Sequence, residues 1–193
     1  MTSFLVEVSA RHVHLNDFAV KTLFGEGYNL TFKKELSQIG QFVCNEKVCV
    51  VGEKGSFKSV SVLGPNRKDV QIELSKTDAR KIGVNAPIKE SGDLQESGSC
   101  KLIGPKGEIF LKKGVIVAKR HIHANEQDAA NLGVKNGDVV FVNILTEQRG
   151  LIFKDVVVRV SNSFSLAMHI DTDEANAANV LKDSKGEIVK INF

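Results

Sequence analysis

All five histidines of this 193-residue chain lie in three short segments, and four of them form two copies of one motif. The motif, Arg-His-x-His, occupies residues 11–14 and 120–123, and the fifth histidine is His169. Apolar, β-branched residues precede each motif, so we expect each copy to end a strand. Side chains at i and i+2 of a strand point to the same face. The two imidazoles of each motif therefore converge, which supplies half of a zinc or other divalent-metal site.

Five histidines exceed the needs of one catalytic zinc site, which keeps a position open for water or substrate, so we expect two sites. His121, His123 and His169 supply three nitrogens for one site. His12 and His14 need a carboxylate for the other. The simpler alternative is a surface strand end with hydrogen-bonded histidines, but the repetition of the motif favours metal binding.

The carboxylate is expected in the segment 64–74, where apolar residues alternate with Gln71 and Glu73. The alternation places these two polar side chains on one strand face, with Glu73 as an oxygen ligand and Gln71 beside it. Arg67 follows a Gly-Pro turn, from which a guanidinium can bind an oxyanion through two parallel hydrogen bonds. On the pattern alone, a solvated strand face and a surface charge remain the plainer alternatives.

Other polar residues have less specific surroundings in the sequence. Ser91 opens a Ser-Gly-Asp turn, from which its hydroxyl can contact an anion. Arg159 stands among apolar neighbours and is expected to point away from them, into a pocket or solvent. Asp173 and Glu174 begin a helix and are expected to cap it. Asp171 either caps the same helix or orients a zinc-bound imidazole.

The composition, with 42% hydrophobic and 25% charged residues, is that of a soluble globular protein with a buried core. A net charge of +3 and the absence of a dense Lys/Arg tract argue against nucleic-acid binding. The three cysteines lack paired spacing, which argues against a disulfide framework and a thiolate zinc site. We expect no membrane partner, because no apolar run reaches transmembrane length. The N-terminus lacks a signal-peptide layout, so we expect a cytoplasmic protein.

The pattern predicts a mainly β fold of small closed barrels with short helices between the strands. The helices are expected at 17–24, 77–82, 125–132 and 173–181. Strands are expected at 4–8, 47–51, 57–63, 70–74, 100–103, 108–111, 114–118, 138–145, 151–160, 166–170 and 187–193.

An internal repeat supports a pair of related barrels. Residues 78–84 resemble residues 128–134, and each segment reads as a short helix that Gly83 or Gly133 ends. The segment 25–45 interrupts this pattern, with two lysines next to each other and weak periodicity. We interpret it as a small excursion or a two-stranded flap.

Five segments together resemble the phosphate propanoyltransferase family, the phosphotransacylases associated with propanediol-utilisation microcompartments. The resemblance covers nearly the whole chain in order. The segments are Ser-Ala-Arg-His-Val-His-Leu at 9–15, Gly-Pro-Asn-Arg with Gln-Ile-Glu at 64–73, Ser-Gly-Asp-Leu at 91–94, Arg-His-Ile-His at 120–123 and Met-His-Ile-Asp-Thr-Asp-Glu-Ala-Asn at 168–176.

The resemblance implies two β-barrel domains with the active site at their interface. Residues 1–10 and 119–193 would form one discontinuous barrel, and residues 11–118 the other. It also implies a dinuclear zinc site, coenzyme A as a substrate and Arg67 as the phosphate contact. The implied zinc ligands are His12, His14 and Glu73 for one ion and His121, His123 and His169 for the other. Gln71, Ser91 and Arg159 would lie near the phosphate and coenzyme A.

These observations predict a zinc-dependent phosphate acyltransferase that interconverts acyl-CoA plus phosphate with acyl phosphate plus CoA. We expect a short acyl chain, acetyl or propanoyl, and direct transfer in a ternary complex, because no residue has the sequence partners of an activated nucleophile. Two alternatives remain: a metal-dependent hydrolase of a phosphate or acyl ester, and a non-enzymatic zinc-stabilised barrel. Members of the family often carry an N-terminal encapsulation extension that this sequence does not show, so we favour the cytoplasm over a microcompartment lumen, while association with a microcompartment stays open. The sequence leaves homo-oligomerisation open.

Overall fold

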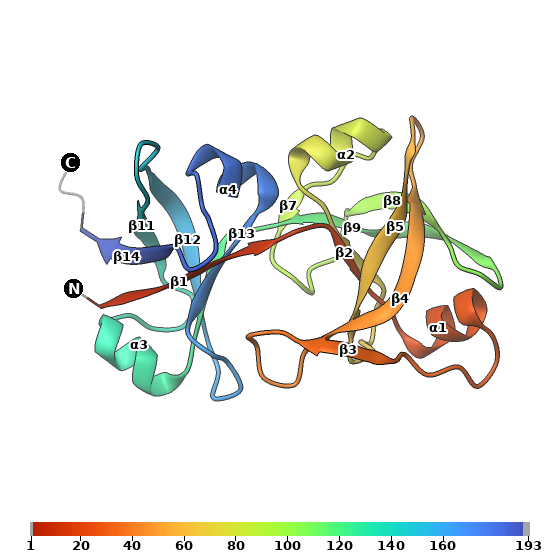
Figure 1. The fold of residues 1–193 in the computed structure, drawn as a ribbon, viewed down its shortest axis with the longest axis horizontal. Helices are drawn as coiled ribbons and strands as arrows, with labels where there is room; N and C mark the ends of the chain where they lie inside the picture. The colour runs from red at the N-terminus through yellow and green to blue at the C-terminus, as the bar shows by residue number, and fades with distance from the viewer. Residues whose placement is uncertain (1, 191–193) are drawn as a thin grey trace. The chain divides into compact units, whose positions relative to one another are not determined.

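The computed structural model describes residues 2–190 and confirms a mainly β fold with few short helices (Figure 1). The chain divides into two compact units. Unit 1 comprises Met1–Ser9 and Lys119–Phe193, and unit 2 comprises Ala10–Ala118. Each unit has a hydrophobic core of its own. Whether the units are the two domains implied by the resemblance stays a prediction.

Unit 1 is a closed barrel in which strands from both ends of the chain pair with one another. Its described strands follow the order β1-β13-β10-β12-β11-β14, and β14 pairs with β1 again. In Figure 1 the red β1 accordingly runs beside the blue β13. The barrel interior holds fully buried side chains such as Ile122, Val158 and Met168. The elements are β1 (Ser3–Ser9), β10 (His121–Ala124), α3 (Glu126–Leu132), β11 (Val139–Leu145), β12 (Ile152–Val160), β13 (Ala167–Asp171), α4 (Thr172–Ala177) and β14 (Lys185–Val189).

Unit 2 contains a second closed ring of strands. The pairings run β4-β5-β2-β6-β9-β8 and return to β4, with β3 and β7 attached at its sides. Its core is dominated by valine and leucine or isoleucine side chains, as the β-branched sequence predicts. The elements are β2 (His12–His14), α1 (Asp17–Phe24), β3 (Phe32–Glu35), β4 (Phe42–Val51), β5 (Ser56–Gly64), β6 (Gln71–Glu73), α2 (Lys76–Ile82), β7 (Ile88–Lys89), β8 (Gly98–Ile103) and β9 (Glu108–Ala118).

The expectation that each histidine motif ends the preceding strand was wrong. The apolar run before the first motif is β1, which stops at Ser9, and a bend at Arg11 separates it from β2. Likewise β9 stops at Ala118, and β10 begins at His121. The physical reason is that each motif and the apolar strand before it belong to different units. The motif therefore pairs with other strands than the apolar strand does. The alternation within each motif is still that of a strand.

Other strand predictions also differ from the structure. The strand predicted at 47–51 is observed as Phe42–Val51, and β7 (Ile88–Lys89) was not predicted. Residues 108–111 and 114–118 form one continuous strand, β9, because Gly114 adopts a positive φ of 139° and lets the strand continue past it. The last predicted strand, 187–193, is observed as Lys185–Val189, and residues 191–193 lie outside the described part of the chain. Helix α4 ends at Ala177, earlier than predicted, and Asn179 then adopts a positive φ of 52°.

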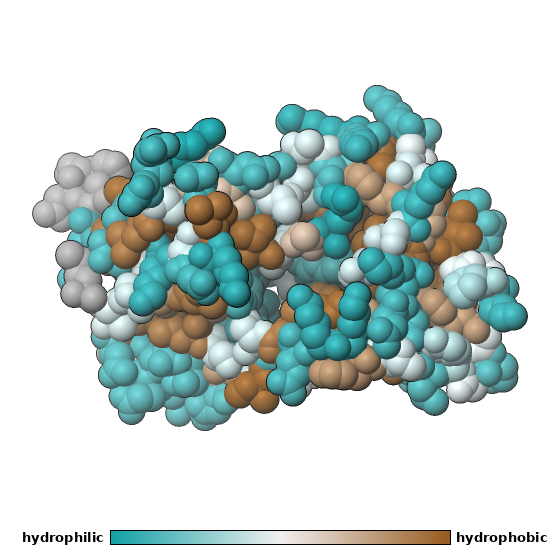
Figure 2. Space-filling view, viewed as in Figure 1, coloured by the Kyte–Doolittle hydropathy of each residue, from teal (hydrophilic) through white to brown (hydrophobic). Residues whose placement is uncertain are grey.

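The segment 25–45 forms a two-stranded flap, one of the two arrangements predicted for it. Strand β3 pairs antiparallel with the start of β4. The buried Glu46 holds the chain ahead of β3, because its carboxylate accepts hydrogen bonds from the Tyr28 hydroxyl at 2.8 Å and the Thr31 amide at 3.0 Å. Figure 2 shows hydrophobic surface around β3 and the loop after it, where Phe32 and Ile39 are exposed.

Each helix begins at a polar residue that caps it. Asn16, Ser75, Asn125 and Asp171 accept hydrogen bonds from amides of the first turn. Gly83 and Gly133 end α2 and α3 in the left-handed conformation, which confirms the predicted role of these two glycines. No helix among residues 2–190 has the length and apolar character needed to cross a membrane.

Gly104, in the turn between β8 and β9, provides a test of how tightly α1 packs. A Cβ there would lie 2.4 Å from the Leu23 carbonyl oxygen at the end of α1. Gly104→Ala should therefore lower the free energy of unfolding by about 1–3 kcal/mol, the usual cost of overpacking. Gly150→Ala is the control, because its Cβ would meet nothing closer than 3.5 Å. Denaturant unfolding of both variants measures the difference, and equal stability would contradict this packing.

Candidate metal centres and their surroundings

The first candidate centre, in unit 2, is formed by His12, His14 and Glu73. Strands β2 and β6 are antiparallel, and their register places His12 directly opposite Glu73. One ligand atom from each of the three side chains lies within 4.8 Å of the others. Both histidines are buried, and Glu73 is nearly so. The structure thus brings together the three residues that the sequence analysis grouped as one site.

A hydrogen bond to a backbone carbonyl determines which ring nitrogen of His12 faces this centre. Nδ1 of His12 lies 2.8 Å from the Ala10 carbonyl oxygen, which can only accept, so Nδ1 carries the proton. Nε2 of His12 is left facing Glu73, 3.5 Å from its Oε2. Nδ1 of His14 is buried without a hydrogen-bond partner among the described residues. An orphaned buried nitrogen of this kind fits a metal ligand.

The electrostatics of the cluster leave His14 neutral. Burial, together with the charges of His12 and Arg67, lowers the pKa of His14 to about 2. Burial acts in the same direction on the pKa of His12, but the Glu73 carboxylate outweighs it and raises that pKa above its ordinary value. Burial would raise the pKa of Glu73, yet His12, His14 and Arg67 hold it well below its usual range. A neutral imidazole and an ionised carboxylate are the forms that bind a divalent metal.

Gln71 connects this centre to the other predicted site residues of unit 2. Its amide nitrogen donates to Glu73 Oε1 at 2.6 Å and to Ser91 Oγ at 2.8 Å, and its oxygen accepts from the Gly92 amide at 2.8 Å. Ser91 Oγ also accepts a hydrogen bond from Arg67 Nη1 at 3.2 Å. The structure therefore joins Glu73, Gln71, Ser91 and Arg67 in one network. Gln71 is fully buried, so the solvated-face alternative does not hold for it.

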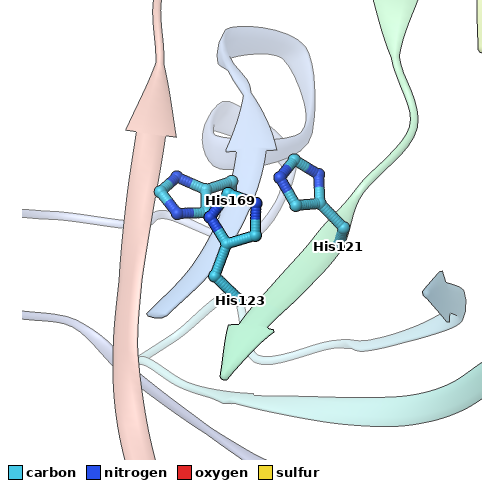
Figure 3. Close-up of side chains that lie close together, drawn as sticks. All are labelled: His121, His123 and His169. Atoms are coloured by element: carbon cyan, nitrogen blue, oxygen red, sulfur yellow. The ribbon is translucent and has the colours of Figure 1, made fainter. Parts of the chain in front are cut away.

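The second candidate centre, in unit 1, is formed by His121, His123 and His169. Strands β10 and β13 are antiparallel and place His121 opposite His169. One ligand atom from each ring lies within 4.8 Å of the others. Figure 3 shows the two rings on β10 and the ring on β13 gathered at one place. The sequence analysis grouped these three histidines as one site, and the structure brings them together.

The surroundings of the unit 1 centre resemble those of the first. Nδ1 of His121 lies 2.8 Å from the Lys119 carbonyl oxygen, which again leaves Nε2 for a metal. Nδ1 of His169 lies 3.6 Å from Oε2 of Glu7 on the neighbouring strand β1. Sequence reasoning missed Glu7, because only the parallel register of β1 and β13 places it beside His169.

Arg159 lies on the strand next to His123. The parallel register of β10 and β12 pairs these two residues directly, so their side chains share a face of the sheet. The Phe164 ring stacks on His123 with 4.0 Å between centroids, and the Arg159 guanidinium carbon lies 5.9 Å from the Phe164 ring centre. The structure therefore places the predicted Arg159 beside the unit 1 centre.

The acidic segment after His169 caps α4. Asp171 Oδ1 accepts hydrogen bonds from the amides of Asp173 and Glu174, at 2.8 Å and 2.9 Å. Glu174 Oε2 accepts from the Asp171 amide at 3.0 Å, which completes a capping box. Capping is thus the observed role of Asp171 and Glu174, whereas the observed carboxylate neighbour of His169 is Glu7.

Both clusters have donor sets suited to zinc. Three imidazoles in one unit, and two imidazoles with a carboxylate in the other, are ligand sets of catalytic zinc, which keeps a fourth position for water or substrate. Backbone carbonyls fix the outer nitrogen of one histidine in each cluster, as is usual for histidines that bind a metal.

Comparison with known proteins agrees with the resemblance. The family described as phosphate propanoyltransferase matches residues 5–181. A phosphate propanoyltransferase of Thermotoga maritima is 52% identical over 174 residues, which cover 90% of this chain and 83% of the relative. That of Clostridioides difficile is 50% identical over 185 residues, covering 96% and 88% of the two chains. The chain therefore belongs to the phosphate propanoyltransferase family and is an acyltransferase.

Proposed function

We propose that this acyltransferase is zinc-dependent and interconverts a short-chain acyl-CoA, acetyl or propanoyl, plus phosphate with acyl phosphate plus CoA. The family supports the reaction class and the substrates. The observation that carries the zinc proposal is the occurrence of two clusters of three potential ligands, buried or partly buried, each built on an antiparallel strand pair. We assign one zinc ion to each cluster.

Arg67 is proposed as the phosphate-binding residue of unit 2. It follows the Gly64-Pro65 turn, and its backbone amide donates to the Leu15 carbonyl at 2.8 Å, which anchors the base of the side chain. Its charge acts on His12, His14 and Glu73, so it lies close enough to favour an anion at that centre. When bound, zinc would supply Lewis acidity toward phosphate and the thioester carbonyl.

Gln71, Ser91 and Arg159 are proposed as neighbours of the substrates. All the polar atoms of the Gln71 amide group are used by Glu73, Ser91 and Gly92, so its main contribution is to hold the Ser91 turn beside Glu73. The Ser91 hydroxyl can still donate to an oxyanion while it accepts from Arg67. Arg159 would supply a positive charge beside the unit 1 centre, for a phosphate of coenzyme A or for the acyl acceptor.

We propose direct transfer in a ternary complex. A phosphate oxygen attacks the thioester carbon, the carbon–sulfur bond breaks, and CoA leaves as the thiolate. A cysteine nucleophile would need a lowered pKa. Burial instead raises the pKa of Cys100 to about 12, and burial with the nearby Glu46 raises that of Cys44 to about 11. These two thiols are therefore unsuited to form an acyl-enzyme. Family membership likewise favours transfer over the hydrolase and the non-enzymatic barrel considered above.

The metal content provides the first test. Each of the two clusters should retain zinc, so elemental analysis of protein purified without added metal should approach two equivalents per chain. Removal of the metal with a chelator should abolish acyl phosphate synthesis, and circular dichroism should report whether the barrels persist. Full activity at one equivalent, or in metal-free protein, would contradict the proposal.

Glu73→Gln tests the carboxylate ligand. The amide keeps the shape of the side chain but removes the charge that offsets the buried His12, so zinc at the unit 2 centre should be lost selectively. We expect one remaining equivalent and a loss of most activity, measured by elemental analysis and CoA release. Glu108→Gln is the matched control, since Glu108 is an exposed strand residue of the same unit. Retention of both ions with normal turnover would remove Glu73 from the site.

Arg67→Lys tests the phosphate contact. Lysine keeps the charge but cannot form two parallel hydrogen bonds to an oxyanion. Because a hydrogen bond to a charged group contributes about 1.5–3 kcal/mol, catalytic efficiency for phosphate should fall on the order of tenfold to a hundredfold. Zinc content should stay unchanged, and the apparent affinity for acyl-CoA should change less. Initial rates against each substrate measure this, with Arg80→Lys as an exposed control; unaltered phosphate kinetics would refute the assignment.

A further inference from the structure

The arginine that opens each Arg-His-x-His motif makes an ion pair that neither the metal ligands nor the substrate contacts explain. Arg11 Nη1 donates to both oxygens of Asp78, at 3.0 Å and 3.2 Å. Arg120 Nη1 donates to Glu174 Oε1 at 2.6 Å, and its Nε donates to the Lys154 carbonyl at 2.7 Å. Asp78 is buried, and Glu174 is nearly so, which is unusual for acidic side chains.

The two acidic partners occupy the same place relative to the metal ligands. In each unit the strand that carries the third ligand ends at a helix whose N-cap is the second residue after that ligand. Ser75 follows Glu73 in this way, and Asp171 follows His169. The acid lies in the first turn of that helix: the amide of Asp78 donates to Ser75 Oγ, and the amide of Glu174 to Asp171 Oδ1.

An aromatic ring completes both arrangements. The Arg11 guanidinium lies 4.4 Å from the centre of Phe57, and that of Arg120 lies 5.2 Å from the centre of Phe153. Each phenylalanine is on the strand parallel to the motif. His12 pairs with Ser61, and Phe57 lies four residues before Ser61. Likewise His121 pairs with Val157, and Phe153 lies four residues before Val157. The same three-part arrangement is thus built twice, although one unit uses Asp and the other Glu.

The position of the ion pair suggests what it does. The ligands of each centre come from two strands whose antiparallel pairing extends over only three residue pairs. In each unit the arginine directly precedes the first histidine of the motif, and its acidic partner follows the ligand on the other strand. The ion pair therefore joins the two strands just beyond the point where these two ligands face each other. In unit 1 the joined segments lead to His121 and His169; in unit 2 they lead to His12 and Glu73.

We propose that Arg11 and Arg120 are positioning residues that hold the third ligand of each centre at the correct distance from the His-x-His strand. They do so through Asp78 and Glu174, without contact with the metal. This inference rests on the proposed function for the metal itself, but it concerns residues outside both ligand sets. A role in stability alone would lower the stability of a unit and leave the zinc affinity of the folded protein unchanged.

Arg120→Gln and Arg11→Gln should each weaken one of the two zinc ions, and each a different one. Competition with a chromophoric chelator on the full chain measures both affinities, and we expect roughly a tenfold loss at the affected centre, the low end for residues that orient ligands. Arg80→Gln is the control, because Arg80 is an exposed arginine of the same helix as Asp78. Unchanged zinc affinities in both folded variants would overturn the proposal, even where thermal stability falls.

Lysine variants separate the two arginines and cover the case in which a glutamine variant fails to fold. Arg11 donates to a single carboxylate, so Arg11→Lys should restore most of the zinc affinity. Arg120 serves Glu174 and the Lys154 carbonyl through different nitrogens, which one ammonium cannot reproduce, so Arg120→Lys should remain impaired. Equal, wild-type affinity in both lysine variants would show that charge alone matters and would contradict positioning.

The ring resonances of the histidines, recorded by NMR on metal-free protein, provide a readout that needs no metal. Arg120→Lys should shift or broaden the signals of His121 and His169 and leave those of His12 and His14 in place. Arg11→Lys should shift the signals of His12 and His14 by a smaller amount and leave those of His121 and His169 in place. A wild type that binds fewer than two zinc ions would contradict the proposed metal content, while these signals still test the positioning. Unshifted signals in both variants would overturn it.

Discussion

The register between two short antiparallel strands is the constraint on which each centre depends. His12 faces Glu73 across β2 and β6, and His121 faces His169 across β10 and β13. A shift by one residue would turn each ligand to the opposite face of its sheet and separate it from its partners. The same pairings are links in the closed rings of strands, so that closure of each barrel also fixes these side chains. A site built on strands in this way is more rigid than one built on loops.

Burial makes this arrangement costly unless a cation or a proton compensates for it. A buried carboxylate or imidazole loses its hydration and must recover that free energy from partners. In unit 2, Gln71 compensates one oxygen of Glu73, and His12 faces the other. His14, with Nδ1 lacking a hydrogen-bond partner among the described residues, is kept neutral by burial and nearby positive charge. His14 is thus already neutral and Glu73 already ionised, as a divalent cation requires. Only His12, whose pKa the Glu73 carboxylate raises, still has a proton to lose.

Much of the fold, and the grouping of the residues in both candidate centres, could be predicted from local patterns. The i, i+2 spacing of the histidines and the alternation around Glu73 are properties of single strands, and the helix ends at Gly83 and Gly133 depend on neighbouring residues. Pairing between distant segments leaves no such local trace. Glu7 lies beside His169 only because β1 and β13 are parallel partners, and the strand break at Arg11 exists because β1 and β2 belong to different units.

The role of Gln71 could not be read from its place in the sequence either, because the face on which a side chain lies does not show which groups it contacts. Alternation correctly placed it on the same face as Glu73, but a residue beside a ligand can face solvent, bind substrate or support the ligand. The hydrogen bonds decide between these three roles, because the Gln71 amide group bonds to Glu73, Ser91 and Gly92. Ser91 in turn accepts from Arg67. A change at the Glu73 carboxylate, a proposed metal ligand, would therefore reach the guanidinium proposed to bind phosphate through the buried Gln71 amide and the Ser91 hydroxyl. Metal and anion binding in unit 2 should accordingly be coupled through structure as well as through charge.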